Sequence, residues 1–190
     1  MNPTGQQASD TAVAGRFTRP PFLYLACLLL GLALDRALPL PLLLPEAALL
    51  RGTVGGGLSL IGATIVATGV GNFSRAATPV PSNQPVRALV TTGLHGWSRN
   101  PIYVGLLLLY VGIGLAARGP WVLLLALPLV LILRYGVVTR EETYLERRFG
   151  DAYRDYTARV RRWLEPVSKS EVLHAGHEGG EQTAQHDVWI

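Results

Sequence analysis

The sequence has little cysteine and little charge. Cys27 is the only cysteine among 190 residues, which excludes an intramolecular disulfide and a thiolate metal cluster. Charged residues make up 16% of the chain, whereas hydrophobic residues make up 49% and gather in long blocks instead of alternating with polar ones. Residues 1–15 also lack the charged start, compact apolar stretch and Ala-x-Ala site of a cleavable leader. The blocks indicate a protein that sits in lipid.

Four apolar blocks predict four membrane-spanning helices, at residues 21–38, 52–73, 101–117 and 120–138. The uncharged part of the first block is shorter than the ~20 residues that span a bilayer comfortably. The second block is rich in glycine and alanine, which predicts a face where membrane helices pack closely. Arg118-Gly119-Pro120 separates the last two blocks, and this order of glycine and proline predicts a tight helical hairpin.

The basic residues cluster at the ends of these blocks, so the net charge of +4 reflects membrane topology and predicts no nucleic-acid partner. In a four-span protein, one side receives Arg16, Arg19, Arg75, Arg87, Arg99 and the arginines after residue 139. The other side receives Arg36, Arg51 and Arg118. Both termini are therefore predicted to be cytoplasmic. A composition rich in alanine, leucine, arginine and glycine favours a bacterial inner membrane, or the endoplasmic reticulum if the source is eukaryotic.

Residues 140–163 are predicted to form two short amphipathic helices that break at Gly150-Asp151 and lie on the cytoplasmic leaflet. Their apolar stripe consists of Leu145, Phe149, Tyr153, Tyr156, Val160 and Trp163. The polar residues 165–190 contain His174, His177 and His186, whose irregular spacing favours a disordered tail over a metal site.

These observations predict an all-α integral membrane bundle of about four transmembrane helices with C-terminal cytoplasmic amphipathic helices. One domain, at residues 20–164, lies between a disordered N-terminal tail at 1–19 and a disordered C-terminal tail at 165–190.

Candidate chemistry begins where a helix starts at the membrane surface, with Asn100 as a good N-cap and Pro101 as a good first residue. Free N–H groups at this end attract anions. Tyr103 lies one turn further, and Gly105 leaves a smooth patch that a ligand or partner helix can approach. An adenosyl amino acid would suit this place, with Arg99 binding its carboxylate.

Three charged residues and one histidine complete the candidate set. Glu141 and Glu142 follow the fourth span closely enough to bind the ammonium and ribose of such a ligand. Arg134 lies inside or at the edge of that span, where it either serves function or extends to the interface. His95 either contacts the cofactor or faces water.

A set of motifs then makes the chain resemble the superfamily of isoprenylcysteine carboxyl methyltransferases and phospholipid methyltransferases. The motifs are Arg99-Asn100-Pro101-x-Tyr103-x-Gly105, an apolar hairpin, Glu141-Glu142-x-x-Leu145-x-x-x-Phe149-Gly150-x-x-Tyr153-x-x-Tyr156 and Arg162-Trp163. The resemblance covers residues 75–164. It implies an S-adenosylmethionine-dependent membrane methyltransferase that takes a lipid or lipidated small-molecule substrate and requires no metal. It also assigns the cofactor pocket to Arg99, Asn100, Tyr103, Gly105, Glu141 and Glu142.

Two departures from the family pattern keep other functions open. The family commonly has histidine where this chain has Asn100, and the run from Gly93 to Trp97 differs from the usual Gly-Pro-Tyr type. Methyl transfer requires positioning and exclusion of water, so no catalytic residue is assigned. The alternatives are an NADPH-dependent membrane reductase related to sterol reductases, and a non-catalytic membrane accessory protein of the same fold. Leu106 after Gly105, and Ile102 in place of asparagine, favour the methyltransferase.

Overall fold

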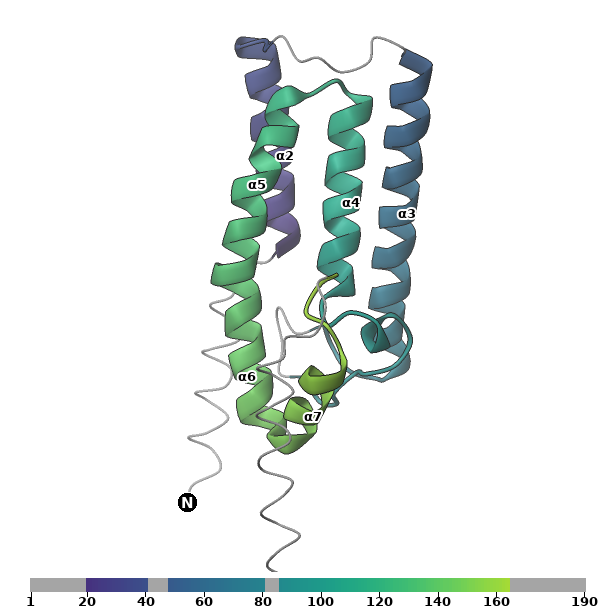
Figure 1. Cartoon of the computed structure of the whole chain (residues 1–190), viewed down its shortest axis with the longest axis vertical. Helices are drawn as coiled ribbons and strands as arrows, with labels where there is room; N and C mark the ends of the chain where they lie inside the picture. Colours follow the sequence, from purple (N-terminus) through teal and green to yellow (C-terminus); the bar gives the residue numbers. More distant parts are fainter. Residues whose placement is uncertain (1–19, 41–47, 81–85, 165–190) are drawn as a thin grey trace, which may run out of the picture.

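A computed structural model describes residues 20–40, 48–80 and 86–164, and this part of the chain is a bundle of helices without strands (Figure 1). The helices are α2 (Pro20–Ala37), α3 (Ala48–Arg75), η1 (Gly93–Gly96), α4 (Pro101–Ala116), α5 (Pro120–Ile132), η2 (Leu133–Val138), α6 (Thr139–Phe149) and α7 (Asp151–Arg159). The predicted all-α class is confirmed. The predicted tails at 1–19 and 165–190, with their histidines, lie outside the described residues.

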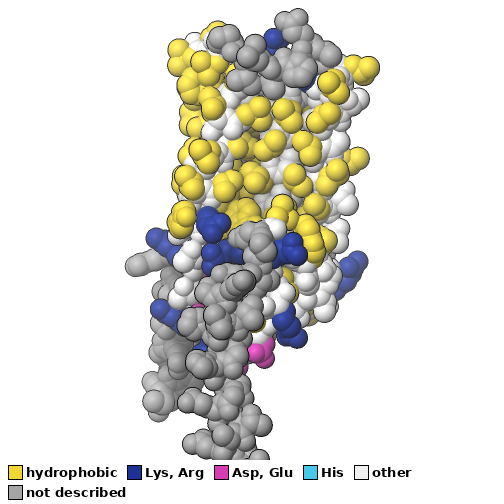
Figure 2. All heavy atoms as spheres, viewed as in Figure 1, with side chains coloured by type: hydrophobic (Ala, Val, Ile, Leu, Met, Phe, Trp, Pro, Cys, Tyr) yellow, Lys and Arg dark blue, Asp and Glu magenta, His cyan; other side chains and the backbone are white. Residues whose placement is uncertain are grey.

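The surface of the bundle is apolar along the lengths of α2 to α5. Three helices of the described chain are long and apolar enough to cross a membrane, namely Pro20–Ala37, Ala48–Arg75 and Pro120–Phe149. α4 is equally apolar but has only 16 residues. Large side chains such as Leu49, Leu60 and Leu127 lie open on the outside, and Figure 2 shows arginines gathered at one border of this apolar surface. Such a surface suits lipid, because exposed apolar patches of this extent are rare on soluble monomers.

Glycines bring α3 and α4 into close contact. Gly55 and Gly62 on α3 lie opposite Gly112 and Gly105 on α4, so closely that a methyl group added at Gly62 would lie 2.5 Å from the Gly105 carbonyl oxygen. The predicted glycine packing face is therefore confirmed, and its partner is α4. The remaining pair of long helices, α2 and α5, pack along each other on the other side of α4.

The predicted hairpin between α4 and α5 is present, but its left-handed residue is Arg118 (φ 55°) and not the glycine that follows it. Gly119 is instead the N-cap of α5, with Pro120 as the first helical residue. The end of α2 is tied to this hairpin: Asp35 Oδ1 accepts from the Trp121 backbone N–H at 2.9 Å, and Trp121 Nε1 donates to the Leu38 carbonyl at 2.7 Å. The carboxylate thereby caps the helix start that glycine leaves uncapped.

The predicted fourth span and the predicted first amphipathic helix form one continuous helical rod, α5–η2–α6 (Figure 1). The prediction of a separate helix on the membrane surface is wrong at this point, because the π-helix η2 joins α6 to α5 without a break. No proline follows Pro128 in this stretch, so nothing in the sequence stops the helix before Gly150. Gly150 does end it, with a φ of 53°, and α7 begins at Asp151 as predicted.

After α7 the chain returns to the start of α4 as a segment that we call the C-terminal strap, residues 160–164. The Arg99 backbone N–H donates to the Arg161 carbonyl at 2.8 Å, and Ser98 Oγ donates to the Arg162 carbonyl at 3.3 Å. Trp163 is buried with Leu133 and other core residues of the membrane bundle. The predicted apolar stripe is divided as a result, because Tyr153, Tyr156 and Val160 pack with Leu89, Leu145 and Phe149 in a separate cluster.

Candidate active site

The first turn of α4 is held from three directions. Asn100 occupies the predicted N-cap position, but its side chain makes no capping bond; its Nδ2 donates instead to the Arg162 carbonyl at 3.1 Å. The predicted cap is wrong in this respect, because the strap competes for the amide. Tyr103 donates its hydroxyl to Glu141 Oε1 at 2.8 Å, and Tyr24 on α2 donates to the Tyr103 carbonyl at 2.9 Å. These bonds join α2, α4, α6 and the strap at one level of the bundle.

Glu142 lies between two arginines. Arg162 grips its carboxylate with two bonds, from Nε to Oε1 at 2.9 Å and between Nη2 and Oε2 at 2.6 Å, while Arg99 Nη1 lies 3.4 Å from Oε1. The side chains of Arg99 and Glu142 are only 5% and 14% exposed. Tyr153 lies next to this pair. Burial is the main cause that raises the pKa of Tyr153, the Glu142 charge raises the pKa further, and the Arg99 charge lowers it. A paired, partly buried network of this kind holds its members in fixed positions.

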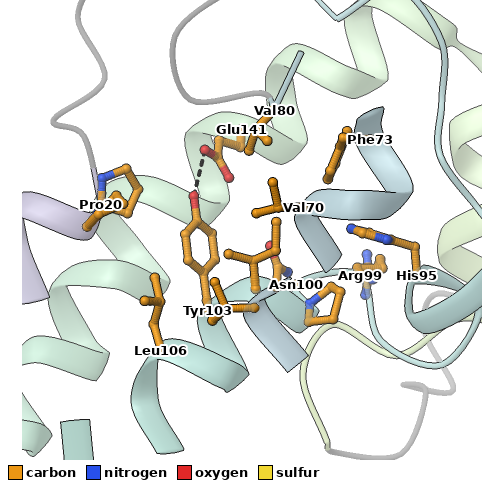
Figure 3. A pocket seen from close by; sticks show the side chains of 14 residues that line it. Pro20, Val70, Phe73, Val80, His95, Arg99, Asn100, Tyr103, Leu106 and Glu141 are labelled. Carbon is orange, nitrogen blue, oxygen red and sulfur yellow. Dashed lines mark hydrogen bonds between the residues drawn. The ribbon is translucent and has the colours of Figure 1, made fainter. Parts of the chain in front are cut away.

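Two adjoining hollows meet beside this network. The first, which we call the apolar cavity, has a volume of about 380 Å³ (Figure 3). It is lined by Pro20, Pro21, Val66, Val70, Phe73, Val80, His95, Arg99, Asn100, Pro101, Ile102, Tyr103, Leu106 and Glu141. The second, the polar pocket, has a volume of about 50 Å³ and is lined by Phe73, Val86, Ala88, Leu89, Val90, His95, Arg99, Asn100, Glu141, Glu142, Leu145, Tyr153 and Tyr156. Phe73, His95, Arg99, Asn100 and Glu141 belong to both linings, so they form a shared wall.

His95 is buried in the shared wall, with 4% of its surface exposed. Its ring packs edge-on against the Phe73 ring, with 4.8 Å between the ring centres. Its backbone carbonyl accepts a hydrogen bond from the Tyr156 hydroxyl at 2.6 Å. Burial lowers the pKa of the imidazole to about 4, so the ring is neutral at neutral pH. Nδ1 is buried and makes no hydrogen bond with the described residues. The alternative of a loop histidine facing water is therefore wrong.

The structure thus brings six of the eight predicted site residues into these linings, and it leaves out Gly105 and Arg134. Gly105 packs against Gly62 of α3, and the Arg134 guanidinium lies 5.9 Å from the centre of the Tyr135 ring. Sequence reasoning missed Phe73 and the other residues of α2 and α3 that line the apolar cavity. Phe73 carried no signal, because an aromatic residue at the end of an apolar block is an ordinary interfacial residue.

One comparison with known proteins matches the part of the chain that contains these site residues. A model of the family described as phospholipid methyltransferase matches residues 50–152, more than half of the 190 residues. The chain belongs to the phospholipid methyltransferase family. The match contains all but the first two residues of α3, the whole of α4 to α6 and every predicted site residue, while the strap lies beyond it.

Other similarities cover less of the chain. An uncharacterized protein of Haemophilus influenzae strain Rd is 54% identical over 35 residues, which are 18% of this chain and 56% of that protein. The match therefore spans little more than half the length of that relative. No solved structure matches.

Membership of the phospholipid methyltransferase family, together with the three long apolar helices, makes this chain an integral membrane protein. The family implies methyltransferase activity at the membrane, which agrees with the resemblance found in the sequence.

Proposed function

We propose that this chain transfers a methyl group from S-adenosylmethionine to a lipid or a lipidated small molecule at the membrane. The observation that carries the proposal is the pair of adjoining hollows, one apolar and about 380 Å³ in volume, the other bordered by charged and phenolic side chains. The apolar cavity lies within the range of ligand sites, roughly 300–1,000 Å³. An amphiphile and a polar cofactor need such neighbouring sites to react with each other.

The residues of the polar pocket fit the chemistry of the cofactor's polar groups, although a volume of about 50 Å³ accommodates one such group and not the whole molecule. Arg99 is a donor for a carboxylate, and Glu142 is an acceptor for an ammonium group or ribose hydroxyls. Leu89, Val90 and Leu145 offer an apolar wall for an adenine. The Nδ1 atom of His95 has no hydrogen-bond partner among the described residues, so it can bond to a ligand. When bound, S-adenosylmethionine supplies a methyl group on a positively charged sulfur, ready for in-line displacement.

In this proposal the protein contributes by positioning the reactants and by excluding water from them. The strap holds Asn100 and the Arg99 backbone, and Arg162 holds Glu142, so the polar groups are fixed before a ligand arrives. The apolar lining keeps water away from the reacting atoms. No metal has a part in this scheme.

Calorimetric titration of the detergent-solubilised protein with S-adenosylmethionine, against NADPH, tests the proposal. We expect saturable binding of the first ligand and at least a tenfold weaker affinity in Arg99→Ala and Glu142→Ala, because each loses a charge-assisted hydrogen bond worth about 1.5–3 kcal/mol. Arg159→Ala is the control, since Arg159 is exposed on α7 and bonds only its own helix among the described contacts. Binding of NADPH alone would favour the reductase, which nothing in the comparisons supports, and binding of neither ligand would favour an accessory protein.

Location and orientation are part of the same proposal. By their places relative to the helices, the arginines of the described residues lie mostly at the site end of the bundle, including Arg87, Arg140 and Arg147, while Arg36, Arg51 and Arg118 lie at the other end. The positive-inside rule then supports a site and two termini on the cytoplasmic side, and the composition supports a bacterial inner membrane. Protease accessibility of a C-terminal tag in inverted vesicles checks the orientation.

A further inference from the structure

The start of α2 lies at the apolar cavity, although α2 is outside the part of the chain that the family model matches. The match begins at residue 50, whereas α2 spans Pro20–Ala37. Pro20 and Pro21 nevertheless line the apolar cavity, while the described residues that line the polar pocket all come from α3 onwards (Figure 3). The two hollows therefore differ in the helices that build them, and α2 contributes to the apolar one.

Tyr24 connects the start of α2 to the first turn of α4. Its hydroxyl donates to the Tyr103 carbonyl at 2.9 Å, and the Tyr103 hydroxyl donates in turn to Glu141 Oε1 at 2.8 Å. Tyr24 and Tyr103 are only 5% and 9% exposed. Two consecutive hydrogen bonds thus run from α2 through α4 to α6, and both Tyr103 and Glu141 line the apolar cavity.

The attachment of α2 to the bundle does not depend on the Tyr24 hydroxyl. The far end of α2 is tied to the hairpin between α4 and α5, and a Cβ added at Gly31 would lie 2.8 Å from the Val122 Cα of α5. A carbonyl in the first turn of an α-helix already accepts an N–H from its own helix, so the Tyr103 carbonyl needs no second donor. Phenylalanine at position 24 would fill the same space without a polar atom to satisfy. The hydroxyl therefore contributes mainly a fixed position of α2 relative to Tyr103.

This fixed position concerns two walls of the apolar cavity. One wall is the start of α2, with Pro20 and Pro21, and the other is the first two turns of α4, with Ile102 and Leu106. Pro21 is exposed on the outside of the bundle and is followed by Phe22, which is 60% exposed, so the cavity adjoins the lipid-facing surface. A hydrocarbon chain suits such walls, because it brings no polar group that would need a hydrogen bond there.

We infer that the start of α2 is the wall against which the hydrocarbon chain of the methyl acceptor packs, and that Tyr24 is the positioning residue of this wall. The inference rests on the proposed function and deepens it. Tyr24 acts through Tyr103, because the bond between them holds the two prolines at a set distance from α4. Since α2 lines the apolar cavity and not the polar pocket, loss of this bond weakens binding of the acceptor chain and leaves cofactor binding unchanged.

The test measures occupancy of the apolar cavity with a photoactivatable amphiphile. The protein is placed in phosphatidylcholine nanodiscs that contain a monoacylglycerol with a diazirine in its acyl chain, and mass spectrometry locates the label after irradiation. Label at residues 102–106 reports a chain in the cavity, because Tyr103 is buried and lines it. Label at Leu127, which is 68% exposed on α5, reports contact with bulk lipid and serves as the reference. Calorimetric titration with S-adenosylmethionine is carried out on the same variants.

Tyr110→Phe is the matched control for Tyr24→Phe. Tyr110 is 2% exposed and belongs to the same core cluster, and its ring packs edge-on against the Tyr24 ring, with 6.3 Å between the ring centres. The Tyr110 hydroxyl has no hydrogen-bond partner among the described residues. Both substitutions remove a buried hydroxyl, but only Tyr24→Phe removes the bond to Tyr103.

We expect the ratio of cavity label to Leu127 label to fall about fivefold in Tyr24→Phe, the change that one neutral hydrogen bond makes to an equilibrium, and to stay within about twofold in Tyr110→Phe. The affinity for S-adenosylmethionine should stay within about twofold of wild type in both variants, whereas a general loss of structure would lower it together with the label.

Three results would each overturn the role of Tyr24 and α2: equal label ratios in the two variants, a parallel loss of cofactor affinity in Tyr24→Phe, and no label at residues 102–106 in the wild-type protein. No binding of S-adenosylmethionine by the wild-type protein overturns the proposed function itself, whatever the labelling.

Discussion

Replacing Gly62 with alanine is expected to force α3 and α4 apart. The added Cβ would lie 2.5 Å from both the Gly105 carbonyl oxygen and the Leu109 backbone nitrogen, whereas ordinary contact begins at 3.4 Å. Both obstacles are backbone atoms, so no side chain can rotate away. The helices must therefore separate by roughly 1 Å, which loosens the dispersion contacts along their whole interface.

The cost of this separation is of the order of an overpacked core, about 1–3 kcal/mol and at the upper end because backbone must move. Gly56→Ala is the matched control, because Gly56 is on the same helix and no atom lies within 4 Å of the Cβ that the substitution would add. The free energy of unfolding of Gly56→Ala should rise by about 0.5–1 kcal/mol, because alanine has less backbone freedom to lose on folding than glycine. Reversible unfolding of the detergent-solubilised protein, followed by far-UV circular dichroism, measures both. Equal stability of Gly62→Ala and Gly56→Ala would refute the reasoning.

Three further predictions concern other contacts. Because burial lowers the pKa of His95 from 6.5 to about 4, the unfolded chain takes up the proton first on acidification. The stability of the protein should be complete above pH 6.5 and fall as the pH approaches 4, and His95→Gln should show a shallower decline in pH-dependent unfolding. Asp35→Ala should lower the free energy of unfolding by about 1 kcal/mol by uncapping α5 at Trp121, whereas Asp35→Asn keeps an acceptor oxygen and should lose less; equal losses would count against the cap. Trp163→Ala removes an 8% exposed side chain from the core and should cost about 3 kcal/mol or more in the same unfolding assay, and a surface-like loss below 0.5 kcal/mol would show that the strap is not anchored there.

Features encoded locally in the sequence were predicted well. The apolar blocks gave the positions of α2 to α5 within a few residues, because a helix surrounded by lipid must be apolar along its length. Asn100-Pro101 and Gly150 marked helix ends, since proline and a left-handed glycine act on their own turn.

Features that depend on distant segments were not predictable from one sequence. The burial of His95 is produced by Phe73 from α3 and by Tyr156 from α7. The bidentate grip of Arg162 on Glu142 requires the strap to return to the bundle, and no local pattern states that return. The join of α5 to α6 was missed because the change from apolar to charged residues at Thr139 looks like the end of a helix, although it marks only the exit from lipid.

The unbroken rod from Pro120 to Phe149 has a consequence for the host membrane. The same continuous element crosses the hydrocarbon and carries Glu141 and Glu142, with Pro128 and the π-helix η2 before the turn that bears the carboxylates. A helix responds to a bilayer thinner than its apolar length by tilting. Tilting this rod moves Glu141 against Tyr103, which stands on a different and shorter helix. We therefore expect the acyl-chain length of the surrounding lipids to affect the spacing between Glu141 and Tyr103.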